Sequence, residues 1–208
     1  LIPDPTVTYT SANSTGSMAF TPVSDQSGTA TITVTVEDGG LGNDLNTTGD
    51  NATFSRTFDV TVNAVNDTTT LDNIADVTID EDAAEQTVNL AGISAGGGES
   101  QPLRVTASSS LAGVVPDPTV TYTSANTTGS LKFTPVSDQS GTATITVTVE
   151  DGGLDGDLNT AGDNATFSRT FDVTVNAVND TTTLDNIVDV AIDEDAAEQT
   201  VNLAGISA

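Results

Sequence analysis

The stretch Ala143-Thr144-Ile145-Thr146-Val147-Thr148-Val149 decides the fold, because apolar and threonine side chains alternate along it without a break. A period of two is typical of a β-strand that buries one face and exposes the other. The same seven letters occur at residues 30–36. The chain contains 38 threonines and 22 valines, and these β-branched residues favour strands over helices. The chain is therefore predicted to be all-β.

The duplicated strand belongs to a long internal repeat. Residues 1–95 match residues 114–208 at a constant offset of 113, without gaps and with 85 of 95 positions identical. Residues 96–113 occur only once. We therefore expect the chain to be either a window of a longer array or a subunit that assembles through its partial repeats.

The turn-rich acidic run Asn66-Asp67-Thr68-Thr69-Thr70 follows one strand pattern and precedes another, and it marks the predicted domain boundary. It divides the chain into the C-terminal part of a repeat at residues 1–66, a complete repeat at 67–179, and the N-terminal part of the next repeat at 180–208. Seven short strands separated by turns indicate an Ig-like antiparallel sandwich. They are predicted at residues 76–80, 86–91, 103–108, 119–123, 130–134, 142–150 and 167–177. The predicted fold is a head-to-tail tandem of antiparallel seven-stranded β-sandwiches with minimal helix.

The composition excludes several classes of function. The chain has 4 Lys+Arg against 30 Asp+Glu, a formal charge of −26. We therefore expect no nucleic-acid binding, and no membrane insertion because no apolar run approaches the roughly 20 residues of a span. Without histidine or cysteine there is no zinc site, thiol nucleophile or imidazole base. The carboxylates instead favour a hard cation such as Ca2+.

Acidic residues and asparagines gather at the predicted strand ends. Loops of a sandwich cluster at its two poles, so units stacked end to end would bring these groups together and offer the 6–8 oxygens that calcium takes. The alternative is that the same acids only solubilise the surface. The candidate calcium ligands are Asp25, Asp38, Asn66, Asp67, Asp80, Glu81, Asp138, Asp151, Asn179, Asp180, Asp193 and Glu194.

These motifs resemble the bacterial cadherin-like repeats of large secreted adhesins, akin to the calcium-dependent cadherin module. The run Phe58-Asp59-Val60-Thr61-Val62-Asn63-Ala64-Val65-Asn66-Asp67 is similar to the family's last strand and its calcium-binding linker. Val77-Thr78-Ile79-Asp80-Glu81-Asp82 resembles the first strand, which implies a ligand role for Glu81 and its counterpart Glu194. Val36-Glu37-Asp38-Gly39 resembles the strand end that reaches the ion from the following domain, a role implied for Asp38 and Asp151.

The chain departs from the family pattern at two places. The loop expected to carry paired aspartates is Gly96-Gly97-Gly98-Glu99-Ser100, with one acid, and the Asp-Arg-Glu turn is Asp25-Gln26-Ser27. One or two ions per junction are therefore expected rather than three.

A second candidate calcium site lies in a long loop. Residues 39–46 match one turn of the calcium-binding β-roll pattern G-G-x-G-x-D-x-U, and the copy at residues 152–159 breaks it at the fourth place. A flexible Gly/Asn turn is the favoured alternative, because a β-roll needs several stacked turns.

These observations together predict a non-catalytic structural spacer of a secreted bacterial surface adhesin or fibre. It would lie outside the cell, with neighbouring repeats as partners and Ca2+ stiffening the junctions between them. The first alternative is a subunit of an extracellular filament, in which the partial repeats of different chains assemble head to tail by strand complementation. The second is an accessory binding module of a secreted enzyme, which the absence of tryptophan disfavours.

Overall fold

The computed structural model describes residues 1–47 and 49–207; residue 208, the last of the predicted third segment, lies outside them. Within that part of the chain the regular structure consists of eleven β-strands and no helix, which confirms the all-β prediction. The strands are β1 (Thr6–Thr8), β2 (Ser17–Ala19), β3 (Gly28–Glu37), β4 (Thr53–Val62), β5 (Val77–Asp80), β6 (Gln86–Leu90), β7 (Leu103–Ser109), β8 (Thr119–Thr121), β9 (Gly129–Phe133), β10 (Gly141–Asp151) and β11 (Thr166–Asn176).

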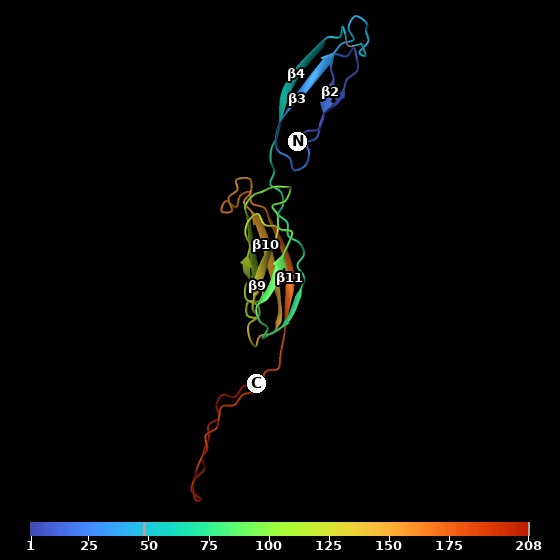
Figure 1. Ribbon diagram of the computed structural model, residues 1–208. Coiled ribbons are helices and arrows are strands. Elements are labelled where there is room, and N and C mark those ends of the chain that lie inside the picture. The colour runs from blue at the N-terminus through green and yellow to red at the C-terminus, as the bar shows by residue number, and fades with distance from the viewer. Residues whose placement is uncertain (48, 208) are drawn as a thin grey trace.

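The central unit, residues 67–179, contains two facing sheets (Figure 1). One sheet has the order β5-β11-β10-β7 and the other β6-β9-β8. All seven strands predicted for this segment occur, each within two residues of its predicted bounds. The structure does not contain a second seven-stranded sandwich among the described residues, because the flanking segments carry fewer strands.

One pairing corrects the prediction of a purely antiparallel fold. β5 lies parallel to β11, with Val77 opposite Val173 and Ile79 opposite Val175. The chain reverses direction after each strand of the unit, so the first and seventh strands run the same way. Their pairing places the start of the unit at one pole and its exit at the other, which suits an end-to-end chain of units.

The core of the central unit follows the alternation in β10. Ala143, Ile145, Val147 and Val149 are all buried, while the threonines between them lie on the outer face. β11 adds a second buried row from the same sheet, and the opposite sheet supplies large apolar side chains that meet both rows. The buried apolar partners are Phe171, Val173, Val175, Leu90, Leu131 and Phe133.

The N-terminal unit, residues 1–66, contains only the pairs β1-β2 and β3-β4. Its sequence repeats that of β8 to β11, yet none of the apolar side chains on its strands is fully buried. Phe58 in β4 is 43% exposed, whereas its counterpart Phe171 is 2% exposed. The difference arises because no strand equivalent to β5, β6 or β7 packs on this unit.

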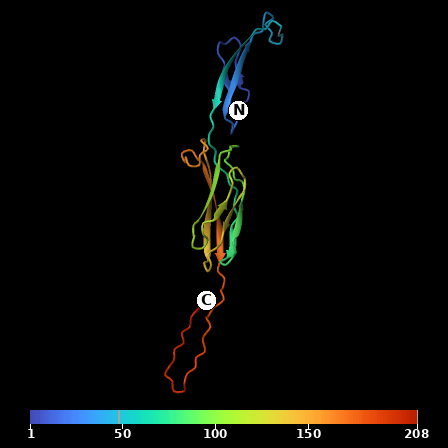
Figure 2. The same cartoon turned by 60° about the vertical axis from the view of Figure 1, so that its left-hand side comes forward.

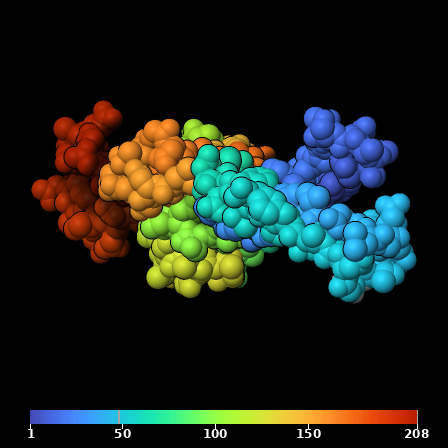
Figure 3. Space-filling view, turned by 90° about the horizontal axis from the view of Figure 1, so that it is seen from above, coloured from blue at the N-terminus to red at the C-terminus, as the bar shows by residue number. Residues whose placement is uncertain are grey.

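The tail, residues 180–207, contains no strand beyond an isolated bridge between Thr183 and Ser207. In Figures 1 and 2 the tail leaves the central unit at the pole opposite the N-terminal unit. The chain there runs outward in an extended conformation, turns, and runs back alongside itself. Seen along the long axis, the N-terminal unit overlaps the central unit and the tail projects to one side (Figure 3). No helix among the described residues is long and apolar enough to cross a membrane.

Candidate metal centre at the unit junctions

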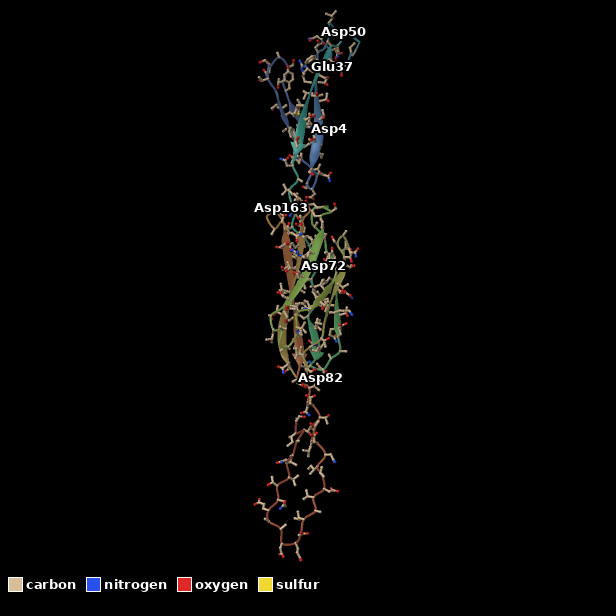
Figure 4. All side chains as sticks on the ribbon, turned by 90° about the vertical axis from the view of Figure 1, so that its left-hand side faces the viewer. Asp4, Glu37, Asp50, Asp72, Asp82 and Asp163 are labelled. Carbon is tan, nitrogen blue, oxygen red and sulfur yellow. The ribbon has the colours of Figure 1, made fainter. Side chains whose placement is uncertain are left out.

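The upper junction joins the N-terminal unit to the upper pole of the central unit. Asn66, in the linker, donates from Nδ2 to Asp151 Oδ1 at 3.1 Å and to the Asp163 backbone carbonyl at 2.9 Å. Its Oδ1 accepts a hydrogen bond from Gln101 Nε2 at 2.9 Å. Figure 4 places Asp163 at this end of the central unit. The linker side chain is therefore held on both of its polar atoms by the following unit.

An open groove lies beside this contact. It has a volume of about 380 Å³ and is lined by both units, with Asp25 from above, Asp67 from the linker and Glu99 from below. The Asp67 backbone amide donates to Glu99 Oε2 at 3.1 Å. Glu99 is the one acid of residues 96–113, and it stands in the loop where the family resemblance led us to expect paired aspartates. Three carboxylates thus border one groove.

Asp151 ends β10 and is completely buried. Its Oδ1 accepts hydrogen bonds from the backbone amides of Gly153 at 2.9 Å and Ala165 at 2.8 Å, besides the contact with Asn66. A buried carboxylate must be satisfied in this way, because an unpaired charge away from water is costly. Asp151 therefore closes its own loop and docks the preceding linker.

Asp38 occupies the equivalent place in the N-terminal unit but contacts no linker. Its Oδ1 accepts from the Ala52 amide at 2.9 Å and the Gly40 amide at 3.0 Å. These backbone hydrogen bonds, the one from Ala52 foremost, lower the pKa of the Asp38 carboxyl below its usual value. The side chain is exposed at the far end of the molecule from the upper junction.

At the lower pole, Glu81 follows β5 and is 5% exposed. Its Oε1 accepts from the Val178 amide at 2.8 Å, and its own amide donates to the Asn176 carbonyl at 3.0 Å. Glu81 continues the inward phase of Val77 and Ile79, which explains its burial. It ties the first strand to the segment that leaves the unit.

Next to Glu81 lies a cluster of three carboxylates, which we name the lower triad: Asp82, Asp138 and Asp180. One oxygen of each lies within 4.8 Å of the others. They come from the end of β5, the turn before β10 and the exit linker. Figure 4 shows Asp82 at this pole. Partial desolvation, a hydrogen bond with Asp138 and repulsion from Asp138, Asp82 and Glu81 raise the pKa of the Asp180 carboxyl above its usual value.

The turn that carries Asp138 has a distinctive backbone. Asp138 adopts φ 57° and its counterpart Asp25 adopts φ 59°. Aspartate tolerates this left-handed conformation better than most residues do. From the two copies of this turn, Asp138 joins the lower triad and Asp25 lines the groove of the upper junction.

The remaining candidates do not join these groups. Asp80 is exposed, and its Oδ1 accepts a 3.4 Å hydrogen bond from Asn176 Nδ2. Asn179 is exposed, and its Nδ2 contacts the Asp180 carbonyl at 3.4 Å. Asp193 and Glu194 lie on the exposed tail, away from both junctions.

The long loop satisfies its own carboxylates. Asp44 Oδ1 accepts from the Asn46 amide and side chain, both at 3.0 Å, which lowers its pKa. Asp50 Oδ2 accepts from the Leu41 amide at 2.8 Å. Within the described residues, the acids of this loop form no group with metal-ligand spacing. The geometry is that of a self-closed turn.

Sequence reasoning missed Asp82, Glu99 and Gln101. Asp82 is the last residue of the acidic run Asp80-Glu81-Asp82. Side chains alternate between the two faces of a strand, so Glu81 points inward like Val77 and Ile79, and Asp82 points outward. Glu99 and Gln101 lie in residues 96–113, which have no second copy to draw attention to them. Their approach to the linker depends on the tertiary fold.

No model of a known protein family matches the chain. No curated protein matches it significantly.

Three solved structures of surface layer protein SbsC are similar to it. Domains 1–6 align with a TM-score of 0.40 and 16% identity, over 81% of this chain and 19% of that one. Domains 4 and 5 align with a TM-score of 0.36 and 15% identity, over 76% and 62%. Domains 4–9 align with a TM-score of 0.37 and 18% identity, over 89% and 24%. The chain spans less than two thirds of each structure, and all TM-scores lie below 0.5, so the function proposed below rests on the junction geometry.

Proposed function

We propose that this chain is a non-catalytic structural spacer of a bacterial surface protein, extended outside the cell and stiffened by Ca2+ at the junctions between units. The observation that carries the proposal is the lower triad of Asp82, Asp138 and Asp180. It lies where one unit passes into the next segment of chain. Such a place suits a cation whose role is to fix the angle between neighbours.

The lower triad is electrostatically unfavourable without a counterion. Three carboxylates with oxygens within 4.8 Å repel one another. Desolvation, together with this repulsion, raises the pKa of the Asp180 carboxyl. The overall charge of −26 adds to the cost. A divalent cation relieves it and finds hard oxygen ligands, which calcium prefers to nitrogen or sulfur.

The two junctions of this chain supply complementary halves of one site. Asp138 and Asp180 are the counterparts of Asp25 and Asp67 at the offset of 113. A junction between two complete units would add Glu99 of the following unit to the lower triad. Four carboxylates offer up to eight oxygens, enough for the 6–8 that calcium takes.

A buried carbonyl oxygen in the upper junction supports the same reading. Gln101 Oε1 has no hydrogen-bond partner among the described residues, although it lies beside the Asn66 linker contact. An unpaired buried oxygen costs about 1–3 kcal/mol, and a cation can remove this cost. Extracellular modules bind calcium at about 0.1–1 mM, so roughly 10 mM calcium would add about 1.4–2.7 kcal/mol per site.

The test is a calorimetric titration of the 208-residue chain with Ca2+ and, separately, with Mg2+. The unmodified chain is expected to bind Ca2+ with a Kd of about 0.1–1 mM and Mg2+ more weakly, because Mg2+ demands a tighter octahedral site. Asp82→Asn, Asp138→Asn and Asp180→Asn are each expected to weaken calcium binding by roughly tenfold or more, since affinity follows ligand charge.

Asp80→Asn is the matched control, since Asp80 is an exposed acid two residues before Asp82 and outside the lower triad. It is expected to leave the Kd unchanged. An equal loss of affinity for Asp80→Asn and Asp82→Asn would mean that calcium responds only to the overall charge. If the unmodified chain shows no heat of binding on titration with Ca2+, the proposal is refuted.

A further inference from the structure

Seven asparagines of the chain begin the sequence Asn-x-Ser/Thr, which is the acceptor sequence for N-linked glycans. A chain with 38 threonines produces several such sequences by chance, so the sequence alone does not select among them. The structure does select, because a glycan is bulky and needs an asparagine whose side-chain nitrogen is accessible at the surface. The seven are Asn13, Asn46, Asn51, Asn66, Asn126, Asn164 and Asn179.

Two of these asparagines lie in the linkers that follow the units. Asn66 Nδ2 donates to both Asp151 and the Asp163 carbonyl, so the following unit holds this nitrogen on two sides. Asn179 is the counterpart of Asn66 in the exit linker, and its Nδ2 contacts the Asp180 carbonyl at 3.4 Å. A glycan on the Asn66 nitrogen would separate the linker from the unit on which it docks.

Three further asparagines lie in the long loops, where an acid engages each side-chain nitrogen. The donor and acceptor pairs are Asn164 to Glu150 at 3.1 Å, Asn51 to Glu37 at 2.9 Å and Asn46 to Asp44 at 3.0 Å. In two of these sequences the third residue, Thr166 or Thr53, already belongs to a paired strand of the sheet. The loops therefore present these asparagines in closed, hydrogen-bonded turns.

Asn126 differs from these five. It lies at the tip of the hairpin between β8 and β9, and it is exposed together with Thr127 and Thr128. Its backbone is fixed, because its amide donates to the Thr123 carbonyl at 3.1 Å and its carbonyl accepts from the Tyr122 hydroxyl at 2.9 Å. Within the described part of the chain, no hydrogen bond engages its side-chain nitrogen. A fixed backbone thus presents a solvated side-chain amide.

The N-terminal unit contains the same hairpin tip. The central hairpin turns at Ala125, which has a left-handed φ of 74°, and the N-terminal hairpin turns at Ala12, with φ 50°. Asn13 is exposed, and its carbonyl accepts from the Tyr9 hydroxyl at 3.1 Å. The same presentation of the asparagine therefore arises twice in the molecule.

The central hairpin tip lies at the upper pole, beside the junction with the N-terminal unit. The Leu103 amide donates to Ser124 Oγ at 2.8 Å, and Leu103 lies opposite Asp151, on which the Asn66 linker docks. Asn126 is exposed although the N-terminal unit occupies this pole. Its accessibility is therefore a property of a complete unit with a neighbour in place.

We propose that Asn126 is an acceptor site for N-linked glycosylation of the folded chain, and that Asn13 is the equivalent site of the N-terminal unit. The donor is a nucleoside-diphosphate sugar, since a small soluble donor suits an acceptor on a fixed hairpin. Asparagine Nδ2 forms a bond to the anomeric carbon and loses one proton. The bond from that carbon to the diphosphate oxygen breaks, and the nucleoside diphosphate leaves with the electron pair. This modification needs no calcium and is independent of the proposed function.

The test incubates the folded 208-residue chain with UDP-glucose and a soluble N-glycosyltransferase that accepts Asn-x-Ser/Thr. Mass spectrometry of the resulting peptides then locates each added hexose. Asn126 and Asn13 are expected to gain a hexose, while Asn66 and Asn164 stay unmodified. Synthetic peptides that carry the Asn66, Asn126 and Asn164 sequences are the control. All three are expected to be modified, because the peptides lack the contacts of the folded chain.

Two substitutions distinguish an acceptor sequence from an asparagine that is only exposed. Thr128→Ala removes the hydroxyl of the third position and is expected to abolish modification of Asn126. Thr127→Ala is the matched control, because it changes the equally exposed middle position and is expected to leave the modification intact. Both side chains are exposed, so both variants are expected to fold. The proposal is overturned if Asn126 stays unmodified in the folded chain, or if Asn66 and Asn164 react there as fast as Asn126.

Discussion

Replacing Phe171 by alanine is expected to lower the free energy of unfolding of the central unit by about 3–5 kcal/mol, the usual cost of removing a buried phenylalanine. Phe171 is 2% exposed and packs among the buried rows of both sheets. The identical substitution at Phe58, which is 43% exposed, is expected to cost its unit far less. The two sites have the same local sequence, so the contrast isolates the effect of burial.

The chain provides its own reporters for this comparison. Of its two tyrosines, Tyr9 lies in the N-terminal unit and Tyr122 in the central unit. Urea unfolding followed by tyrosine fluorescence therefore reports one unit at a time in a Tyr9→Phe or a Tyr122→Phe background. Equal losses at Phe171 and Phe58 would mean that the two units bury this face alike, contrary to the structure.

Replacing Asp151 by alanine is expected to destabilise the central unit by about 3 kcal/mol. The change leaves the backbone amides of Gly153 and Ala165 without their acceptor in a buried place. Each unsatisfied buried donor costs about 1–3 kcal/mol. The same change removes one of the two acceptors of Asn66 Nδ2 and leaves the Asp163 carbonyl, so the Asn66 side-chain amide resonance is expected to shift.

Asp38→Ala is the control for this substitution. Asp38 accepts the equivalent two backbone amides, from Gly40 and Ala52, but it is exposed and touches no linker. Water replaces the lost acceptor there, so the effect on urea unfolding is expected to be smaller. A larger effect at Asp38 than at Asp151 would contradict the assignment of Asp151 as the residue that docks the linker.

The fold of the central unit was predictable because each strand shows a clear alternation of apolar and polar residues and is separated from the next by a polar turn sequence. In β10 every second residue is apolar, and this pattern alone identifies Ala143 and Val149 as members of one buried row. The parallel pairing of β5 with β11 was not predicted. It follows from the odd number of strands together with the closure of the sheet, and neither is visible in any local stretch of sequence.

The candidate site was predictable only as a location. The acids at strand ends do gather at the two poles, and Asp138 and Asp180 do meet. Which acids face the linker depends on strand phase at Asp82 and on the approach of a loop that occurs once at Glu99. Composition and spacing do not carry that information, because it arises from the packing of distant segments.

Identical stretches adopt different environments in this molecule. Residues 30–36 and 143–149 share every letter, yet Val149 is fully buried and Val36 largely exposed. Local pattern sets the strand, and neighbouring segments decide whether its apolar face is covered.

The central claim, that calcium stiffens the junctions, is tested most directly by the distance distribution between spin labels on the two units. Thr57→Cys and Thr170→Cys place labels at equivalent exposed positions of β4 and β11. A chain labelled at Thr57 alone reports the local mobility of the label on β4, which calcium at the junction is not expected to change. The account predicts a distribution that is broad in EDTA and narrows on saturation with Ca2+, and that stays broad with calcium in the Asp67→Asn variant. Distributions of equal width in EDTA and Ca2+ would contradict it.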